Sequence, residues 1–210
     1  MIEIFIVDDH AIVREGLAKL IDFEKDIKVV GMASDSAQAL KMITNQKMDV
    51  IILDISMPGR SGLDIIKDIK TARPGVYIII LSMYQEERFA IRAFKSGASG
   101  YITKDMATEE IVNAIRKVQS GGKYISARFA ETLVNEMSSP SELLPHERLS
   151  DREFEVMCML ASGKTVSTIA KELFLSDHTI STYRRRILDK MNLKNNADLI
   201  HYAVDHGFWV

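Results

Sequence analysis

Short apolar runs alternate with longer amphipathic stretches over about the first 120 residues. The apolar runs are IEIFIV, IKVVGMA, DVIILDI, VYIIILS and ASGYIT, and residues with helical spacing fill the stretches between them. Runs rich in Val, Ile and Leu are typical of strands that are buried on both faces of a parallel sheet. We therefore predict five successive βα units that form a doubly wound α/β domain.

The last third of the chain carries a helical pattern throughout. Ser150 followed three residues later by Glu153 is a capping box, and it predicts a helix that ends at Gly163. Further helices are predicted over about 166–174, from Ser176 or Asp177 to Met191, and over about 196–206. This pattern predicts a small all-α domain of four helices.

The region between these domains reads as a linker. We predict a short helix over 127–137, and the two prolines of SSPSELLPHER predict that regular structure stops between Ser138 and Arg148. The predicted domains are therefore residues 1–120 and 149–210, joined by a linker over 121–148.

Composition narrows the class of protein. Hydrophobic residues make up 47% of the 210 positions and charged residues 27%, which is an ordinary globular balance. No apolar run reaches the roughly 18 residues that a membrane helix needs, and the N-terminus MIEIFIVDDH lacks the basic region of a signal peptide. The sequence thus predicts a cytoplasmic protein, in which the single cysteine, Cys158, is a small buried hydrophobe.

Polar side chains cluster where the predicted strands end. Asp8 and Asp9 follow the first strand, Asp54 ends the third, Ser82 ends the fourth, and Lys104 follows the fifth. Parallel α/β sheets bind ligands at this edge. Three carboxylates cannot stay ionised together without a cation, and an all-oxygen set favours Mg²⁺. With Mg²⁺, the lysine and the serine nearby, the carboxylate of Asp54 is suited to attack a phosphoryl group.

Each of these residues also has an ordinary structural interpretation. Asp9 could cap the helix that begins near His10, and a lone aspartate after a strand does so more often than it binds metal. Asp54, Ser82 and Lys104 could be a loop carboxylate, a strand-end hydroxyl and a solvated cation. The joint placement of all five residues at one edge favours a binding site.

The motifs VDDH, LDISMPGRSG, the LS pair at Leu81 and Ser82, and YITK resemble the receiver domain of two-component response regulators. The resemblance covers nearly all of residues 1–120 and implies a flavodoxin-like fold. It also implies that Asp54 is the phosphoacceptor, that Asp9 and Asp54 bind Mg²⁺ directly, that Asp8 binds it through water, and that the backbone carbonyl of Ser56 completes the protein ligands.

The same resemblance implies a conformational switch. In receiver domains the residue at Ser82 moves toward the phosphoryl group and the aromatic residue at Tyr101 turns inward. Lys104 would stabilise the phosphoryl oxygens. Receivers often have a cis proline after this lysine, but Asp105 follows here, and a non-proline cis bond costs about 3 kcal/mol. The sequence leaves the isomer of this bond open.

Two of the predicted C-terminal helices have the spacing of a helix-turn-helix. IAKELF and HTISTYRRRILDKM are separated by LSD. On the second of these helices Ile180, Ile187 and Met191 share one face, whereas the opposite face is polar. Residues 149–210 hold eight Lys or Arg against eight Asp or Glu, so any attraction to DNA depends on local clusters.

The segment from Leu149 to Asn195 resembles the LuxR-type output domain, which with the receiver implies a NarL/FixJ-family regulator, not an enzyme. Ser181 and Tyr183 stand where lysine and histidine are frequent in that family. The residues that we predict to contact DNA are, for base edges, Ser181, Thr182 and Arg185, and, for phosphates, Lys164, Arg184, Arg186 and Lys190.

These features predict a regulator that a sensor histidine kinase phosphorylates and that then dimerises on two DNA half-sites. Three alternatives remain. A free phosphatase also uses an aspartyl nucleophile, but it places a second aspartate where Ser56 stands. A flavin-binding module explains neither the acidic cluster nor Lys104. A DNA-binding regulator that works without phosphorylation is the third.

Overall fold

The computed structural model describes residues 1–57, 60–84, 86–105, 108–126, 129–131 and 144–208. The chain divides into two compact units, residues 1–136 and 137–210. None of the helices in the described residues is long and apolar enough to cross a membrane.

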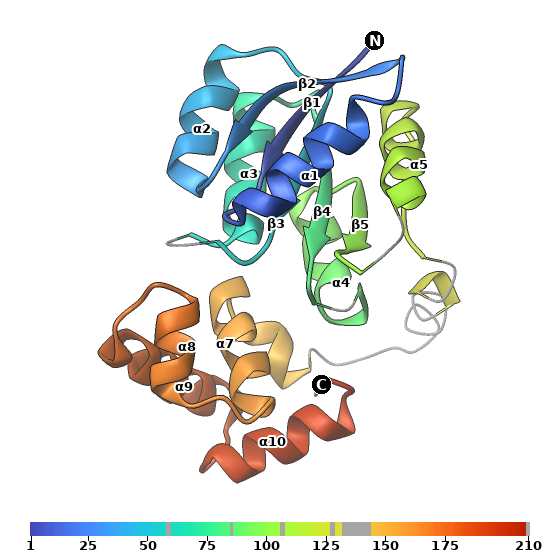
Figure 1. The fold of residues 1–210 in the computed structure, drawn as a ribbon. Helices are drawn as coiled ribbons and strands as arrows, with labels where there is room; N and C mark the ends of the chain where they lie inside the picture. Colours follow the sequence, from blue (N-terminus) through green and yellow to red (C-terminus); the bar gives the residue numbers. More distant parts are fainter. Residues whose placement is uncertain (58–59, 85, 106–107, 127–128, 132–143, 209–210) are drawn as a thin grey trace. The chain divides into compact units, whose positions relative to one another are not determined.

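A five-stranded parallel sheet forms the first unit (Figure 1). Its strands are β1 (Ile2–Val7), β2 (Ile27–Ala33), β3 (Val50–Asp54), β4 (Tyr77–Ser82) and β5 (Gly100–Thr103). They lie in the order β2-β1-β3-β4-β5, and every neighbouring pair is parallel. This is the flavodoxin-like doubly wound order, so the predicted fold class is confirmed.

Helices cover both faces of this sheet (Figure 1). They are α1 (Ala11–Ile21), α2 (Ser36–Asn45), α3 (Gly62–Ala72), α4 (Glu86–Ser96) and α5 (Thr108–Gln119). Apolar residues of α1 and α5 pack against alternate strand residues such as Ile4, Ile52 and Ile79. The intervening residues, including Phe5 and Ile78, are also fully buried. Burial on both faces explains why the strands carry continuous apolar runs.

The second unit is helical. It contains α7 (Asp151–Ala161), α8 (Val166–Glu172), α9 (Asp177–Met191) and α10 (Asn196–Asp205). The predicted capping box is present, since the Ser150 hydroxyl accepts from the Glu153 N–H and the Glu153 carboxylate accepts from the Ser150 N–H. Ser176, not Asp177, is the N-cap residue of α9.

The core of this unit follows the predicted helical faces. Ile180, Ile187 and Met191 of α9 are buried, and Cys158 of α7 is 2% exposed. The core also encloses an ion pair, with Arg152 Nη1 2.5 Å from Glu155 Oε2. Mutual charge compensation allows both groups to lie in the interior.

Regular structure is present at the C-terminal end of the predicted linker, contrary to our expectation. Pro145–Arg148 forms a short 3₁₀ helix, η1, where we expected irregular chain. Pro145 occupies its first turn, which needs no N–H from that residue, and the Glu147 carboxylate accepts from the Leu144 N–H. Of the helix predicted over 127–137, residues 129–131 are helical, and the rest lies outside the described residues.

Aromatic side chains hold η1 against α10. His146 Nδ1 lies 2.7 Å from the Tyr202 hydroxyl oxygen. The His146 ring also meets the Phe208 ring edge-on, with centroids 4.6 Å apart, and Phe208 in turn packs edge-on against Phe154 of α7. The end of the linker is therefore packed into the core of the second unit.

Candidate functional site: a buried acidic pocket and an exposed helix face

The polar residues at the strand ends converge on one edge of the sheet. Asp8 directly follows β1, Asp54 ends β3 and Ser82 ends β4. Lys104 follows β5, and its backbone N–H donates to the Ser82 carbonyl at 2.7 Å. Parallel strands bring these positions together although Asp8 and Lys104 are 96 positions apart in the sequence.

The ammonium group of Lys104 bridges two buried carboxylates. Lys104 Nζ lies 2.7 Å from Asp8 Oδ2 and 2.8 Å from Asp54 Oδ2. Both aspartate side chains are 2% exposed, and that of Lys104 is 8% exposed. Three charged groups thus share a site that is nearly closed to solvent, where each charge is worth more than at the surface.

Burial governs the protonation of this pocket. The pKa of Asp54 is raised from 3.8 to about 7, mainly by burial and also by the nearby Asp8 charge, against the opposing effects of Lys104 and the Ser56 N–H. Burial alone would lower the pKa of Lys104, but the charges and hydrogen bonds of Asp54 and Asp8 outweigh it and raise that pKa. Without a further cation, the pocket therefore holds more negative charge than it can stabilise.

Asp9 and His10 complete the acidic end of the pocket. Ligand atoms of Asp8, Asp9, His10 and Asp54 all lie within 4.8 Å of one another. Asp9 Oδ1 is buried without a hydrogen-bond partner. Helix α1 begins after His10, which is its N-cap residue, so Asp9 does not occupy the capping position. The acidic cluster is compatible with Mg²⁺, which prefers carboxylate oxygens.

The loop after Asp54 is held close to the start of α3. Ser61 caps α3, and its hydroxyl donates to the Ile55 carbonyl. A Cβ on Gly62 would lie 1.9 Å from the Asp54 carbonyl oxygen, so only glycine fits at this position. Ser61 and Gly62 therefore position the backbone of Asp54. The sequence reasoning did not identify this role, because the close approach joins residues from different elements.

Hydrogen bonds connect Ser82 to Tyr101 through one intermediate residue. The Tyr84 N–H donates to Ser82 Oγ at 3.1 Å, and the Tyr101 hydroxyl donates to the Tyr84 carbonyl at 2.9 Å. Tyr101 is 1% exposed, and the Tyr84 ring stacks on Phe89 of α4. The two residues predicted to switch together are thus coupled through Tyr84, which the sequence analysis missed.

The peptide bond after Lys104 is trans, as are all peptide bonds among the described residues. The isomer that the sequence left open is thereby assigned. Asp105 itself is exposed.

A second candidate site is the outer face of α9. Ser181, Arg185 and Arg186 are exposed on it, and Thr182 is half-buried with its hydroxyl donating to the His178 carbonyl. Ser181, Thr182 and Arg185 lie opposite the buried Ile180 and Ile187, as the helical pattern predicted. The face offers hydroxyl and guanidinium groups, which suit the major groove of DNA.

The other basic candidates contact neighbouring elements. Arg184 Nε donates to Asn196 Oδ1 at 2.7 Å, and Lys190 Nζ lies 2.5 Å from Glu153 Oε2. Lys164 Nζ lies 2.5 Å from Glu172 Oε2. The two lysines are therefore paired with carboxylates and Arg184 with a side-chain amide, whereas Arg185 and Arg186 lie exposed on α9.

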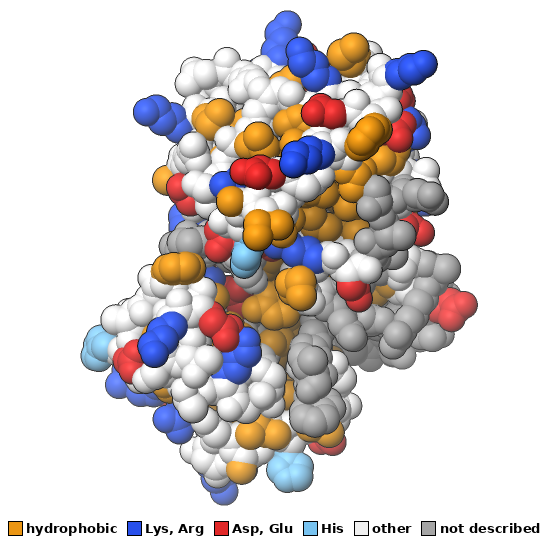
Figure 2. All heavy atoms as spheres, in the orientation of Figure 1, with side chains coloured by type: hydrophobic (Ala, Val, Ile, Leu, Met, Phe, Trp, Pro, Cys, Tyr) orange, Lys and Arg blue, Asp and Glu red, His pale blue; other side chains and the backbone are white. Residues whose placement is uncertain are grey.

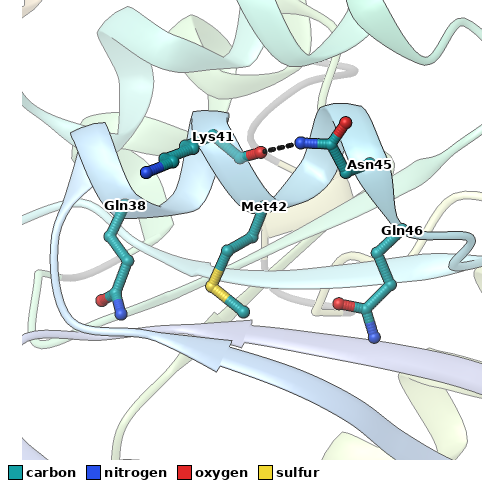
Figure 3. Close-up of a pocket in the computed structure, with 5 residues that line it drawn as sticks. All are labelled: Gln38, Lys41, Met42, Asn45 and Gln46. Carbon is teal, nitrogen blue, oxygen red and sulfur yellow. Dashed lines mark hydrogen bonds between the residues drawn. The ribbon is translucent and has the colours of Figure 1, made fainter.

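A hollow of about 530 Å³ lies on α2, and it resembles neither site (Figure 3). Its lining contains amides, one thioether and one ammonium group, with no carboxylate or imidazole: Gln38, Lys41, Met42, Asn45 and Gln46. On the face drawn in Figure 2, basic and acidic side chains are interspersed over both units.

Two family models match the chain. The response regulator receiver domain matches residues 4–116. The luxR family of bacterial regulatory proteins matches residues 147–203. The first match contains the acidic pocket, and the second contains α9.

Relatives match over nearly the whole chain. The response regulator UvrY of Escherichia coli is 36% identical over 208 residues, which cover 99% of this chain and 95% of UvrY. The oxygen regulatory protein NreC of Staphylococcus epidermidis is also 36% identical, with 96% of each chain covered.

Solved structures of full-length regulators share the fold. RcsB from Salmonella enterica serovar Typhimurium, bound to the promoter rprA in the presence of the phosphomimetic BeF₃⁻, superposes with a TM-score of 0.66 at 27% identity, covering 96% of this chain and 97% of RcsB. The predicted family is confirmed by these matches together. The chain belongs to the NarL/FixJ family of two-component response regulators, which join a receiver domain to a LuxR-type DNA-binding output domain.

Proposed function

We propose that Asp54 accepts a phosphoryl group from a sensor histidine kinase and that this controls binding of residues 149–210 to DNA. The observation that carries the proposal is the buried pocket in which Lys104 pairs with both Asp54 and Asp8. An ionised carboxylate needs no general base to attack phosphorus, and an adjacent ammonium group offsets the charge that the new phosphoryl group brings. Residues 1–120 thus act as the receiver and residues 121–148 as the linker.

Residues of the pocket would bind Mg²⁺ and orient the carboxylate of Asp54. Asp9 and Asp54 would bind Mg²⁺ directly, Asp8 through water, and the Ser56 carbonyl would complete the protein ligands. The buried Asp9 Oδ1 without a hydrogen-bond partner supports this assignment. Bound Mg²⁺ supplies charge neutralisation at the phosphoryl oxygens. Lys104 holds and orients the Asp54 carboxylate, and the Ser56 N–H donates to its other oxygen at 3.2 Å.

The switch would act through Ser82. When its side chain rotates so that the hydroxyl donates to a phosphoryl oxygen, Oγ moves away from the Tyr84 N–H that donates to it in this structure. The backbone at Tyr84 must then shift, and with it the carbonyl that accepts from Tyr101. This relay gives a physical route from the phosphoryl group to the surface near α4 and β5.

The output step is binding to promoter half-sites as a homodimer. Ser181, Thr182 and Arg185 are proposed to contact base edges, and Lys164, Arg184, Arg186 and Lys190 phosphates. Exposure of Arg185 on the polar face of α9 supports this. Since its target is DNA, we place the protein in the cytoplasm.

Intact-protein mass after incubation with acetyl phosphate and Mg²⁺ tests the receiver. We expect one acid-labile phosphate on wild type and none on Asp54→Asn, with a shift toward dimer in sedimentation only for wild type. Asp105→Asn is the matched control, because it removes an exposed carboxylate next to Lys104 and should accept phosphate normally. Absence of phosphate on wild type would support the phosphorylation-independent alternative.

Titration of promoter DNA tests the output domain. Arg185→Ala should lose about 1–3 kcal/mol of specific binding if the guanidinium reads a guanine. Arg186→Ala should weaken binding by the same factor on every DNA sequence. The affinity of this variant should also depend less steeply on salt concentration than that of wild type. Equal losses on specific and random DNA for both variants would show that neither residue reads bases.

A further inference from the structure

The imidazole of His10 faces the acidic pair of the pocket. His10 Nδ1 forms a hydrogen bond with Asp8 Oδ1 at 3.3 Å and lies 2.8 Å from Asp9 Oδ1. The His10 backbone N–H also donates to Asp8 Oδ1 at 2.8 Å, which fixes the main chain of His10 beside the pocket. The ring is 62% exposed, so burial does not force it into this position.

The contact with Asp9 is close but is not a hydrogen bond. Asp9 Oδ1 lies 2.8 Å from the ring nitrogen and yet has no hydrogen-bond partner, so the two atoms approach without the required alignment. Two donor atoms that bind one cation at about 2.1 Å and at right angles lie about 3 Å apart. The separation of Nδ1 and Oδ1 thus fits two neighbouring ligands of one ion. To bind the ion, Nδ1 would give up its hydrogen bond to Asp8, and the neutral ring would carry its proton on Nε2.

We propose that His10 Nδ1 is a further ligand of the divalent cation in this pocket and that it makes the site prefer Mn²⁺ or another first-row transition ion over Mg²⁺. Imidazole nitrogen binds such ions far better than it binds Mg²⁺, which keeps oxygen ligands and water. The inference rests on the proposed function, because it requires that the acidic pocket bind a divalent cation.

Metal titration of the full-length chain tests this directly. Free Mn²⁺ is measured by electron paramagnetic resonance for wild type and His10→Ala, and Mg²⁺ affinity is measured by competition. We expect His10→Ala to lower the ratio of Mn²⁺ to Mg²⁺ affinity about tenfold or more, with Mg²⁺ affinity nearly unchanged. His201→Ala, which removes an exposed imidazole of α10, should leave the ratio as in wild type.

Electron spin echo modulation gives a readout that depends on the nitrogen itself. Mn²⁺ bound to wild type should show coupling to a directly ligated ¹⁴N nucleus, and His10→Ala should lose it. Circular dichroism of His10→Ala shows whether the receiver still folds.

The outcomes separate the two proposals. Binding of both ions by wild type without ¹⁴N coupling, or with an affinity ratio that His10→Ala does not change, overturns the role of His10 and leaves the proposed function standing. An equal loss of both affinities in a folded His10→Ala also overturns it, because the histidine then affects binding without selecting the ion. Failure of wild type to bind either ion overturns both proposals.

Discussion

Replacing Asp54 by asparagine is expected to stabilise the first unit when no metal ion is bound. Burial raises the pKa of Asp54 from 3.8 to about 7, a difference of roughly 3 pK units. Since each unit corresponds to about 1.4 kcal/mol, the ionised carboxylate destabilises the folded state by about 4 kcal/mol. Asparagine removes this charge, while Lys104 keeps its ion pair with Asp8.

The effect should depend on pH with a defined sign. A carboxyl group whose pKa is higher in the folded state binds its proton more tightly there, so its penalty is absent below about pH 4. The penalty grows as the pH rises from about 4 to 7 and is complete above about pH 7. The advantage of Asp54→Asn over wild type should therefore increase from about 1 kcal/mol at pH 4.5 to about 4 kcal/mol at pH 8.

Urea-dependent hydrogen exchange measures this, because peptides from β1 and β3 report on the first unit alone. The stabilities of the two proteins are compared in EDTA and then in excess Mg²⁺. Binding of Mg²⁺ should stabilise the wild-type protein more than Asp54→Asn. Asp105→Asn is the control for loss of an exposed negative charge and should change stability by less than about 0.5 kcal/mol. Equal stability of wild type and Asp54→Asn at pH 8 in EDTA would falsify the argument that burial strains this carboxylate.

Three further predictions concern other parts of the chain. Gly62→Ala should destabilise the first unit by about 1–3 kcal/mol in the same exchange experiment and slow phosphate uptake, because its Cβ would displace the backbone of Asp54. Ser150→Ala should lower the stability of the second unit by about 1 kcal/mol in thermal unfolding, since it removes the cap of α7; no change would mean that the capping box contributes little. The phosphorylated form should have a half-life of minutes or longer, because Ser56 lacks the acid or amide that could hold an attacking water. Intact-protein mass measured over time checks this, and a half-life of seconds would contradict it.

The sheet and its functional edge follow from the sequence because they depend on local patterns. Continuous apolar runs identified all five strands, and the residue types at four of the strand ends identified the pocket. Parallel pairing then brings those ends together by topology alone, so Asp8, Asp54 and Lys104 meet although they are far apart in the chain.

Contacts that depend on side-chain geometry could not be predicted in this way. The partner of Lys190 is Glu153, 37 residues away, and Arg184 donates to Asn196 of another helix. The composition of SSPSELLPHER likewise hid η1, because Pro145 breaks a helix interior but favours a first turn. The VDDH motif showed the acidic residues, but no pattern along the chain showed that the ring of His10 faces them.

The packing of His146 against Tyr202 and Phe208 limits where the chain can be divided to make a DNA-binding fragment or a hybrid regulator. A fragment that begins at Leu149, where the helical pattern starts, would lack the imidazole and expose the aromatic rings that it covers. An excised DNA-binding fragment should therefore start no later than Leu144, and a hybrid with a foreign receiver should be joined upstream of that residue. Joined later, the hybrid would carry α10 with an uncovered aromatic surface and would be prone to self-association before any signal arrives.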